Sequence, residues 1–267
     1  MITLRDIQRL KETKKKITMV TCYDSTFARL LDQSSIEMIL IGDSAAMVMH
    51  GHGSTLPATI AMMSAHTAAV ARSAKTKLIV ADMPFLSFRK GKDSALLAAE
   101  KLMRAGAHAV KIEGTAGHEE TIQFIVQSGI PVMGHIGLTP QSIHQLGGFR
   151  VQGKDLRKRK ALIEEAKLLE ALGCFSIVLE CVPTALGKEI TQGLGIPTIG
   201  IGAGSATDGQ VLVLQDLLGL NPEFKPKFVR HFGDGFQFAT NAIEAFSASV
   251  KSGTYPSVEE SYVDESH

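Results

Sequence analysis

Four short hydrophobic runs in this chain each end on a charged residue. They are Met38–Asp43, Leu78–Asp82, Ala109–Glu113 and Ser176–Glu180. A short run rich in isoleucine and valine is typical of a strand that is buried on both faces of a parallel sheet. A lone carboxylate is costly to bury unless a metal or another cation compensates its charge. Repeated acids at the ends of buried strands therefore indicate a divalent-metal site with a proton-transfer group.

The composition indicates a globular chain that can form a sizeable core. Its 267 residues are 45% hydrophobic, and 28 basic against 27 acidic residues leave a net charge of +1. The protein therefore has no large overall positive charge that would attract nucleic acid or an acidic membrane. No apolar run approaches the roughly 18 residues of a membrane helix, and residues 1–16 lack the apolar segment of a secretory signal. Three cysteines without Cys-x-x-Cys spacing favour a reducing compartment. We expect a soluble, cytoplasmic protein without nucleic-acid or membrane partners.

Glycines recur between amphipathic stretches and the hydrophobic runs that follow them. The positions are Gly106, Gly129, Gly173 and Gly195. Glycine is common just past the end of a helix because it adopts the left-handed conformation without steric cost. The segment from Asp93 to Gly106 shows the pattern, and Asp93 is the predicted N-cap of its helix. The chain therefore alternates between helices and strands.

Eight strands are predicted along the chain, near residues 17–22, 38–42, 78–82, 109–113, 131–135, 177–181, 197–201 and 210–214. Helical stretches separate most of them, including one over residues 156–172. Roughly 250 residues of alternating strands and helices is the usual extent of a (β/α)₈ barrel. A doubly wound open sheet is the alternative, but the first strand–helix turn lacks the Gly-x-Gly-x-x-Gly motif of dinucleotide-binding sheets. We predict an α/β protein whose residues 1–267 form a single-domain (β/α)₈ TIM barrel.

The alternation of side chains along the strands predicts where the polar groups point. Residues two apart share a face of a strand, so Asp43 is expected on the same face as Ile39 and Ile41. The same rule applies to the other strands. If these faces line the barrel interior, six polar groups meet at its C-terminal mouth, where barrel enzymes carry out chemistry. These groups belong to Asp43, Asp82, Lys111, Glu113, His135 and Glu180.

The residue types suggest roles for this set. Asp43 and Asp82 are the leading metal ligands, and carboxylates without cysteine or clustered histidine favour Mg²⁺ over Zn²⁺. Alternatively, each aspartate caps the following helix. Lys111 and Glu113 fit either a structural ion pair or a substrate-binding cation beside an acid near the metal. Glu180 fits a general base, or a buried acid hydrogen-bonded to the next loop.

Ten collinear blocks resemble the ketopantoate hydroxymethyltransferase family, and the resemblance extends from about Ile17 to Pro256. The blocks are Thr21–Asp24, Gly42–Ser44, Gly51–Pro57, Ala81–Phe85, Val110–Gly114, Gly134–Ser142, Gly147–Gly153, Leu179–Pro183, Gly200–Gly204 and Asp208–Gln210. One departure is Thr115, which follows Gly114 where the family usually has a second glycine.

The resemblance implies an activity. A member of this family is a (β/α)₈ barrel that assembles as a homodecamer. It transfers a hydroxymethyl group from 5,10-methylenetetrahydrofolate to 3-methyl-2-oxobutanoate, giving 2-dehydropantoate for pantothenate biosynthesis. The expected partners are therefore a small 2-oxo acid, a folate and further copies of the chain.

The resemblance also implies residue roles. Glu180 corresponds to the family's proton acceptor. The residues implied to bind Mg²⁺ or support its site are Asp43, Asp82 and Glu113. The residues implied to hold the 2-oxo acid are Asp43, Ser44, Asp82 and Lys111.

Two other classes of protein compete with this interpretation. A Mg²⁺ barrel of the phosphoenolpyruvate mutase and isocitrate lyase type would cleave or rearrange a 2-oxo acid without folate. Its Lys-Lys-Cys-Gly-His-like block is absent from this sequence. A non-catalytic barrel that serves as a scaffold would not need the acids and Lys111 together.

Overall fold

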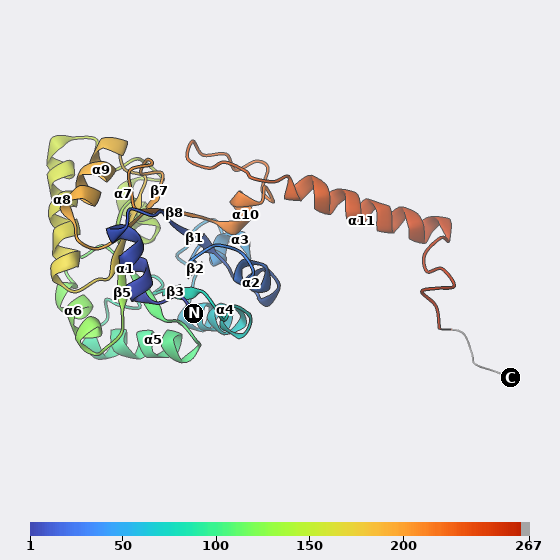
Figure 1. The fold of residues 1–267 in the computed structure, drawn as a ribbon, viewed down its shortest axis with the longest axis horizontal. Helices are drawn as coiled ribbons and strands as arrows, with labels where there is room; N and C mark the ends of the chain where they lie inside the picture. Colours follow the sequence, from blue (N-terminus) through green and yellow to red (C-terminus); the bar gives the residue numbers. More distant parts are fainter. Residues whose placement is uncertain (263–267) are drawn as a thin grey trace. The chain divides into compact units, whose positions relative to one another are not determined.

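Eight parallel strands close into a barrel in the order β1 to β8, which confirms the predicted fold (Figure 1). The structure is a computed structural model that describes residues 1–262. Residues 263–267, which the predicted domain included, lie outside the described part of the chain. The strands are β1 Ile17–Thr21, β2 Met38–Ile41, β3 Leu78–Asp82, β4 Ala109–Glu113, β5 Val132–Gly137, β6 Ser176–Glu180, β7 Thr198–Ile201 and β8 Gly209–Leu212.

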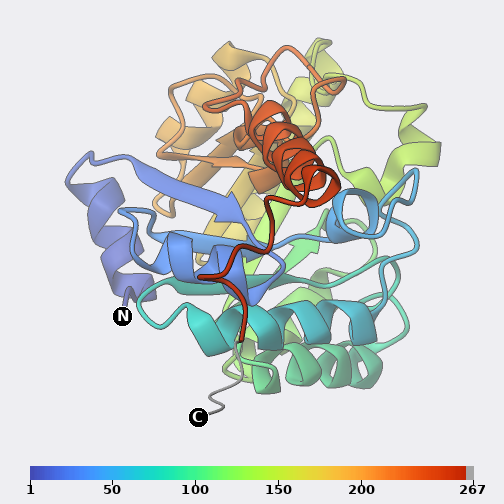
Figure 2. The same cartoon turned by 90° about the vertical axis from the view of Figure 1, so that its right-hand side faces the viewer.

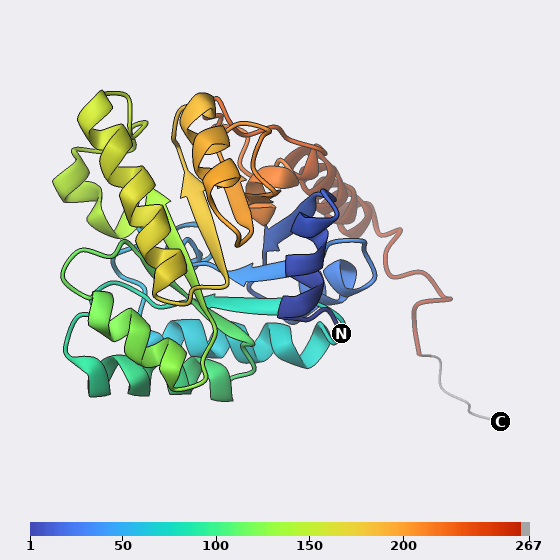
Figure 3. The same ribbon diagram turned by 60° about the vertical axis from the view of Figure 1, so that its left-hand side comes forward.

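The described chain also contains helices, and those that connect β1 to β7 cover the outside of the barrel (Figure 3). Their bounds are α1 Leu4–Glu12, α2 Ser25–Asp32, α3 Ala45–Val48, α4 Ile60–Ser73, α5 Lys92–Arg104, α6 Glu119–Gln127, the 3₁₀ turn η1 Pro140–Ser142, α7 Ile143–Leu146, α8 Leu156–Ala171, α9 Thr184–Gly193, α10 Leu214–Leu217 and α11 Gly235–Ser252. Within residues 1–262, no helix combines the length and apolar composition that crossing a bilayer requires.

The chain divides into two compact units, and the barrel lies in the first, Met1–Leu214. The second unit begins at Gln215 and contains α11. Asp234 caps the start of α11, and Gly253 ends it in the left-handed conformation. None of the side chains of α11, the long red helix in Figure 2, is buried. Its large exposed apolar residues are Phe236, Phe238, Ile243, Phe246 and Val250.

The barrel interior is filled by one buried apolar side chain or two from each strand. Ile7 of α1 belongs to the same cluster. The strand residues are Ile17, Met19, Met38, Leu40, Leu78, Val80, Ala109, Met133, Val178, Ile199 and Val211. On β3, β4, β5 and β6 this pattern agrees with the predicted strand faces. The polar residues on these faces therefore point into the same interior, and they are Asp82, Lys111, Glu113, His135 and Glu180.

The predicted face of β2 is wrong. Met38 and Leu40 belong to the interior cluster, so Ile39 and Ile41 face the surrounding helices. The strand ends at Ile41, and Asp43 lies in the turn that follows. Asp43 therefore reaches the mouth through the geometry of this turn, because strand alternation no longer applies beyond the last paired residue.

The predicted N-cap of α5 is also wrong, although the helix itself is confirmed. The helix starts at Lys92, Gly91 occupies the cap position with a φ of 93°, and Asp93 lies in the first turn. An acid in the first turn still interacts favourably with the helix dipole. At the other end, Gly106 has a φ of 109°, and a Cβ there would lie 2.5 Å from the Cβ of Ala71. Both the backbone angle and the close packing require glycine at this turn.

Candidate active site

Lys111 lies at the centre of the polar cluster at the mouth of the barrel. Strand pairing sets Asp82 beside Lys111 and Glu113 beside His135. The Nζ of Lys111 lies 3.1 Å from Oδ1 of Asp82 and 3.2 Å from Nδ1 of His135. Burial alone would lower the pKa of the Lys111 ammonium, but the surrounding Asp82, Glu113 and Asp43 raise it above its usual range. Lys111 is therefore a permanent cation in a buried position.

His135 joins the two glutamates of the cluster. Its Nδ1 lies 3.4 Å from Oε1 of Glu113, and its Nε2 lies 3.2 Å from Oε2 of Glu180. Burial and the charge of Lys111 lower the pKa of His135, but contacts with the two glutamates outweigh them and raise it to about 9. The imidazole therefore carries a positive charge at neutral pH and orients both carboxylates.

Asp43 sits against Asp82 although both are acidic. The backbone N–H of Asp43 donates a 2.9 Å hydrogen bond to Oδ2 of Asp82. Burial, followed by the charges of Asp82 and Glu113, raises the pKa of Asp43 well above its usual value. Burial also raises the pKa of Asp82, against the opposing effect of Lys111. Burial therefore disfavours ionisation of this pair by more than its neighbours offset.

Glu113 differs from the two aspartates. Burial would raise its pKa, but hydrogen bonding and charge from His135, followed by Lys111, lower it below its usual value. Glu113 therefore remains ionised beside the two cations.

Glu180 is the most accessible acid of the cluster. Its side chain is 16% exposed, whereas those of Asp82 and Glu113 are almost fully buried. Its backbone carbonyl accepts a hydrogen bond from the N–H of Leu138. Cys181, directly after it, has a φ of 48°, which residues other than glycine rarely adopt. The surrounding structure therefore holds Glu180 at the edge of the mouth in a turn that local preference disfavours.

Ser44 is held in place by a hydrogen bond to a buried tyrosine. The hydroxyls of Tyr23 and Ser44 lie 2.8 Å apart and share a hydrogen bond. Tyr23 follows β1 and is almost fully buried. The serine hydroxyl next to Asp43 therefore has a defined position at the mouth.

Gln141 is a site residue that reasoning from the sequence missed. Its side-chain Nε2 donates to Oδ2 of Asp43 at 2.9 Å and to the carbonyl of Met83 at 3.0 Å. Its backbone N–H donates to Oε2 of Glu113 at 3.0 Å. Gln141 lies in the short 3₁₀ turn η1, where no hydrophobic period marks a residue as buried, and only its place in the Gly134–Ser142 block pointed to it. Gln141 therefore links Asp43, in the turn after β2, to Glu113 at the end of β4.

Thr115, where the sequence departs from the family pattern, has a structural partner. Its backbone N–H and its hydroxyl donate to Oε1 of Glu165 at 3.0 and 3.1 Å. The loop after β4 is therefore tied to α8 through this carboxylate.

The donor set fits a hard divalent cation. The cluster contains four carboxylates and two cations. The carboxylates belong to Asp43, Asp82, Glu113 and Glu180, and the cations are Lys111 and His135. Oδ1 of Asp82 and Oε1 of Glu113 are buried, and each lies at ion-pair distance from one cation, Lys111 at 3.1 Å and His135 at 3.4 Å. In the same part of the chain, no three acid, histidine or cysteine side chains form a ready-made metal cage. Mg²⁺ usually binds one or two carboxylates together with water and substrate, so it does not require such a cage.

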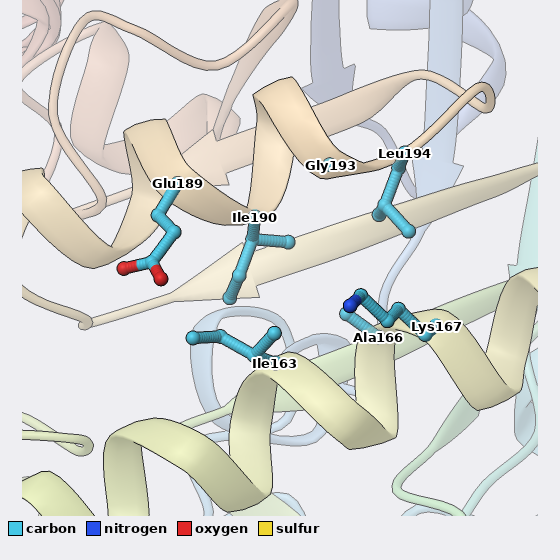
Figure 4. Close-up of a pocket in the computed structure, with 7 residues that line it drawn as sticks. All are labelled: Ile163, Ala166, Lys167, Glu189, Ile190, Gly193 and Leu194. Atoms are coloured by element: carbon cyan, nitrogen blue, oxygen red, sulfur yellow. The ribbon is translucent and has the colours of Figure 1, made fainter.

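A separate hollow lies between α8 and α9 and contains none of these residues (Figure 4). It has a volume of about 130 Å³ and is lined mainly by apolar side chains such as Ile163 and Ile190. Lys167 and Glu189, of opposite charge, also line it. We assign no chemistry to this hollow.

Comparison with known proteins identifies similar sequences over almost the whole chain. The profile of the family described as ketopantoate hydroxymethyltransferase matches residues 1–258. A 3-methyl-2-oxobutanoate hydroxymethyltransferase of Bdellovibrio bacteriovorus is 54% identical over 262 residues, which cover 98% of this chain and 100% of the relative. The enzyme of the same name from Coxiella burnetii is 54% identical, covering 95% of this chain and 96% of the relative.

Solved structures with low sequence identity share the fold. Phosphonopyruvate hydrolase in complex with oxalate and Mg²⁺ superposes with a TM-score of 0.62 at 12% identity, covering 97% of this chain and 93% of that one. 2,3-Dimethylmalate lyase, a member of the PEP mutase/isocitrate lyase superfamily, gives a TM-score of 0.61 at 15% identity, covering 99% of this chain and 93% of that one.

Proposed function

This chain belongs to the ketopantoate hydroxymethyltransferase family, and we propose that it transfers a hydroxymethyl group from 5,10-methylenetetrahydrofolate to 3-methyl-2-oxobutanoate. The product would be 2-dehydropantoate, for pantothenate biosynthesis. The observation that carries the proposal is the buried acid cluster around Lys111 and His135, with Glu180 at its more exposed edge. Such a cluster combines a place for a cation, a place for an anionic substrate and a proton acceptor.

The 2-oxo acid would bind between the cation site and Lys111. Asp43 and Asp82 would hold Mg²⁺ with support from Glu113, whose Oε1 lies in the same buried cluster beside His135. Bound Mg²⁺ supplies Lewis-acid polarisation of the 2-oxo group, a contribution of several kcal/mol. Lys111 would neutralise the substrate carboxylate, and the Ser44 hydroxyl, held by Tyr23, would hydrogen-bond to it.

Glu180 would accept the proton from C3 of the substrate. His135 lies 3.2 Å from its carboxylate and holds it in place. The electron pair left at C3 would then form the new carbon–carbon bond with the one-carbon unit of the folate. This carbon would exchange its two bonds to folate nitrogens for the bond to C3 and a bond to the oxygen of a water molecule. The proton from C3 and one proton of the water would end on the two nitrogens, giving tetrahydrofolate. Asp43, Asp82, Lys111 and Glu113 are buried, so bulk water would have little access to this side of the site.

Proton NMR tests this proposal directly. 3-Methyl-2-oxobutanoate is incubated with the protein and Mg²⁺ in D₂O, first alone and then with methylenetetrahydrofolate. We expect loss of the C3 proton signal in the first stage, abolished by EDTA, and a new hydroxymethyl signal in the second. If folded protein shows neither signal, the assignment of this site is wrong. Cleavage of the 2-oxo acid without folate would instead favour a lyase related to the proteins that share this fold.

We also propose that the chain works as a cytoplasmic homo-oligomer, a decamer by resemblance to the family, in which residues 1–267 serve one catalytic domain. The exposed apolar side chains of α11 support association, because a helix without a buried face is not stabilised by its own unit. Light scattering coupled to size-exclusion chromatography measures the assembly. A monodisperse monomer of 28.6 kDa would contradict this part of the proposal.

A further inference from the structure

A groove of about 400 Å³ lies between α4, α5 and the loop that follows β3. Its first wall is made by Pro84 and Phe85, the second and third residues after Asp82. Three residues of extended chain span at most about 11 Å, so the groove begins close to the acid cluster. Its opposite wall is formed by α5, through Leu97 and Lys101.

The apolar part of the groove is open to a ligand. Phe85 is 41% exposed and Leu97 is 57% exposed, although both line the same hollow. Leu86, directly after Phe85, has a φ of 59°, so the backbone of the turn that carries the phenyl ring is strained. An aromatic side chain held outward beside a leucine is suited to pack against a flat ring.

The charged part of the groove contains two lysines that form no ion pair within residues 1–262. They are Lys90 and Lys101. Nearby basic residues are used differently, since Lys92 pairs with Glu120 at 2.8 Å and Arg89 donates to the carbonyl of Ala116. The hydroxyl of Ser87, which also lines the groove, has no hydrogen-bond partner in the described chain. The groove therefore combines an apolar surface with unpaired positive charge.

We propose that this groove binds the p-aminobenzoyl-glutamate part of the folate co-substrate, an inference that rests on the function proposed above. The flat benzoyl ring packs against Phe85 and Leu97. The glutamate carboxylates bind Lys90 and Lys101. This orientation directs the pteridine end, which carries the one-carbon unit, toward Asp82 and the mouth of the barrel. Each further glutamate of a polyglutamylated folate adds negative charge to the same positively charged groove.

Charge reversal of both lysines tests the assignment. The variant Lys90→Glu/Lys101→Glu is compared with Lys188→Glu, a matched change on α9, whose residues do not line this groove. Dissociation constants for tetrahydrofolate monoglutamate and triglutamate are measured by calorimetry at low and high salt. We expect the double variant to bind the triglutamate about tenfold more weakly. A single exposed ion pair contributes little to affinity, but the double variant replaces two attractive charges with two repulsive ones. The loss is expected to be smaller for the monoglutamate and smaller at high salt.

The folate-independent C3 exchange reaction separates this inference from the proposed function. Exchange needs only the acid cluster, so it should stay within about twofold of wild type in both charge variants. If the double variant binds the triglutamate as tightly as Lys188→Glu does, the groove is not the folate site. If the wild-type protein binds no folate and performs no exchange, the proposed function itself fails. A neutral variant, Lys90→Gln/Lys101→Gln, should show an intermediate loss of affinity, and an unchanged affinity there would also count against the groove.

Discussion

Replacing Gln141 by leucine should weaken both the protein and its cation site. Leucine keeps most of the side-chain volume but cannot donate to Asp43 or to the carbonyl of Met83. A hydrogen bond to a charged group is worth about 1.5–3 kcal/mol, and one between neutral groups about 1 kcal/mol. We therefore expect the metal-free variant to lose about 2–4 kcal/mol of unfolding free energy.

The same substitution should reduce the affinity for a divalent cation. Without the Gln141 donor, burial and the neighbouring acids favour the protonated form of Asp43 more strongly, since they already raise its pKa. A proton then competes with the metal for the same oxygen atoms. Loss of a residue that orients a metal ligand typically costs 10- to 100-fold in affinity, and we expect a loss in this range.

Two measurements and one control decide the matter. Urea unfolding in EDTA gives the stability, and titration with Mn²⁺, followed by electron paramagnetic resonance, gives cation affinity without any assay of turnover. The control is Gln152→Leu, which removes only a hydrogen bond to the carbonyl of Arg150 in the same segment of the chain. If Gln141→Leu matches the control in both measurements, Gln141 does not hold Asp43 in the way described.

The remaining predictions concern the mechanism, one helix end and the thiols. Glu180→Gln should retain the 2-oxo acid but exchange C3 at least about 100-fold more slowly, and near-normal exchange would remove Glu180 from the mechanism. Asp43→Ala should abolish activity and Mg²⁺ dependence together, and an active, Mg²⁺-dependent variant would exclude Asp43 as a required ligand. Gly106→Ala should destabilise by about 2–4 kcal/mol, from backbone strain and the clash with Ala71. Gly129 has a similar φ of 86°, but no described atom lies within 4 Å of an added Cβ, so Gly129→Ala should cost only about 1 kcal/mol. Equal losses of unfolding free energy for the two variants in urea would contradict the clash at Gly106. Burial raises the pKa of Cys22 to about 11 and those of the other two cysteines to about 12. Iodoacetamide at pH 8 should therefore label the native thiols at least about 100-fold more slowly than the unfolded ones, and rapid native labelling would contradict their burial.

The sequence was sufficient for the barrel because its signals are local and repeated. Hydrophobic runs of four to six residues specify buried strands, and glycines such as Gly106 end the helices between them. Parallel strands have their carboxyl ends at one edge, so the acids that end β3, β4 and β6 had to meet once the barrel closed. For these strands the alternation of side chains also predicted the interior face.

Positions beyond the strand ends could not be predicted in this way. Asp43 lies in a turn after β2, where the two-residue period no longer applies, and the face assigned to it was wrong although its place at the mouth was right. Gln141 was missed because its three hydrogen bonds reach residues between 28 and 98 positions away in the chain. No local pattern encodes such contacts.

The chain by itself thus determined the fold, the family and the set of acids with Lys111, since each depends on residue type and on the period of a strand or helix. Tertiary structure alone decided how these groups are charged and held. The raised pKa of His135 and the hydrogen bond from Gln141 to Asp43 depend on burial and on residues that are distant in the sequence. The groove with Phe85 and Lys101 arises in the same way, because it exists only where a loop and two helices pack together.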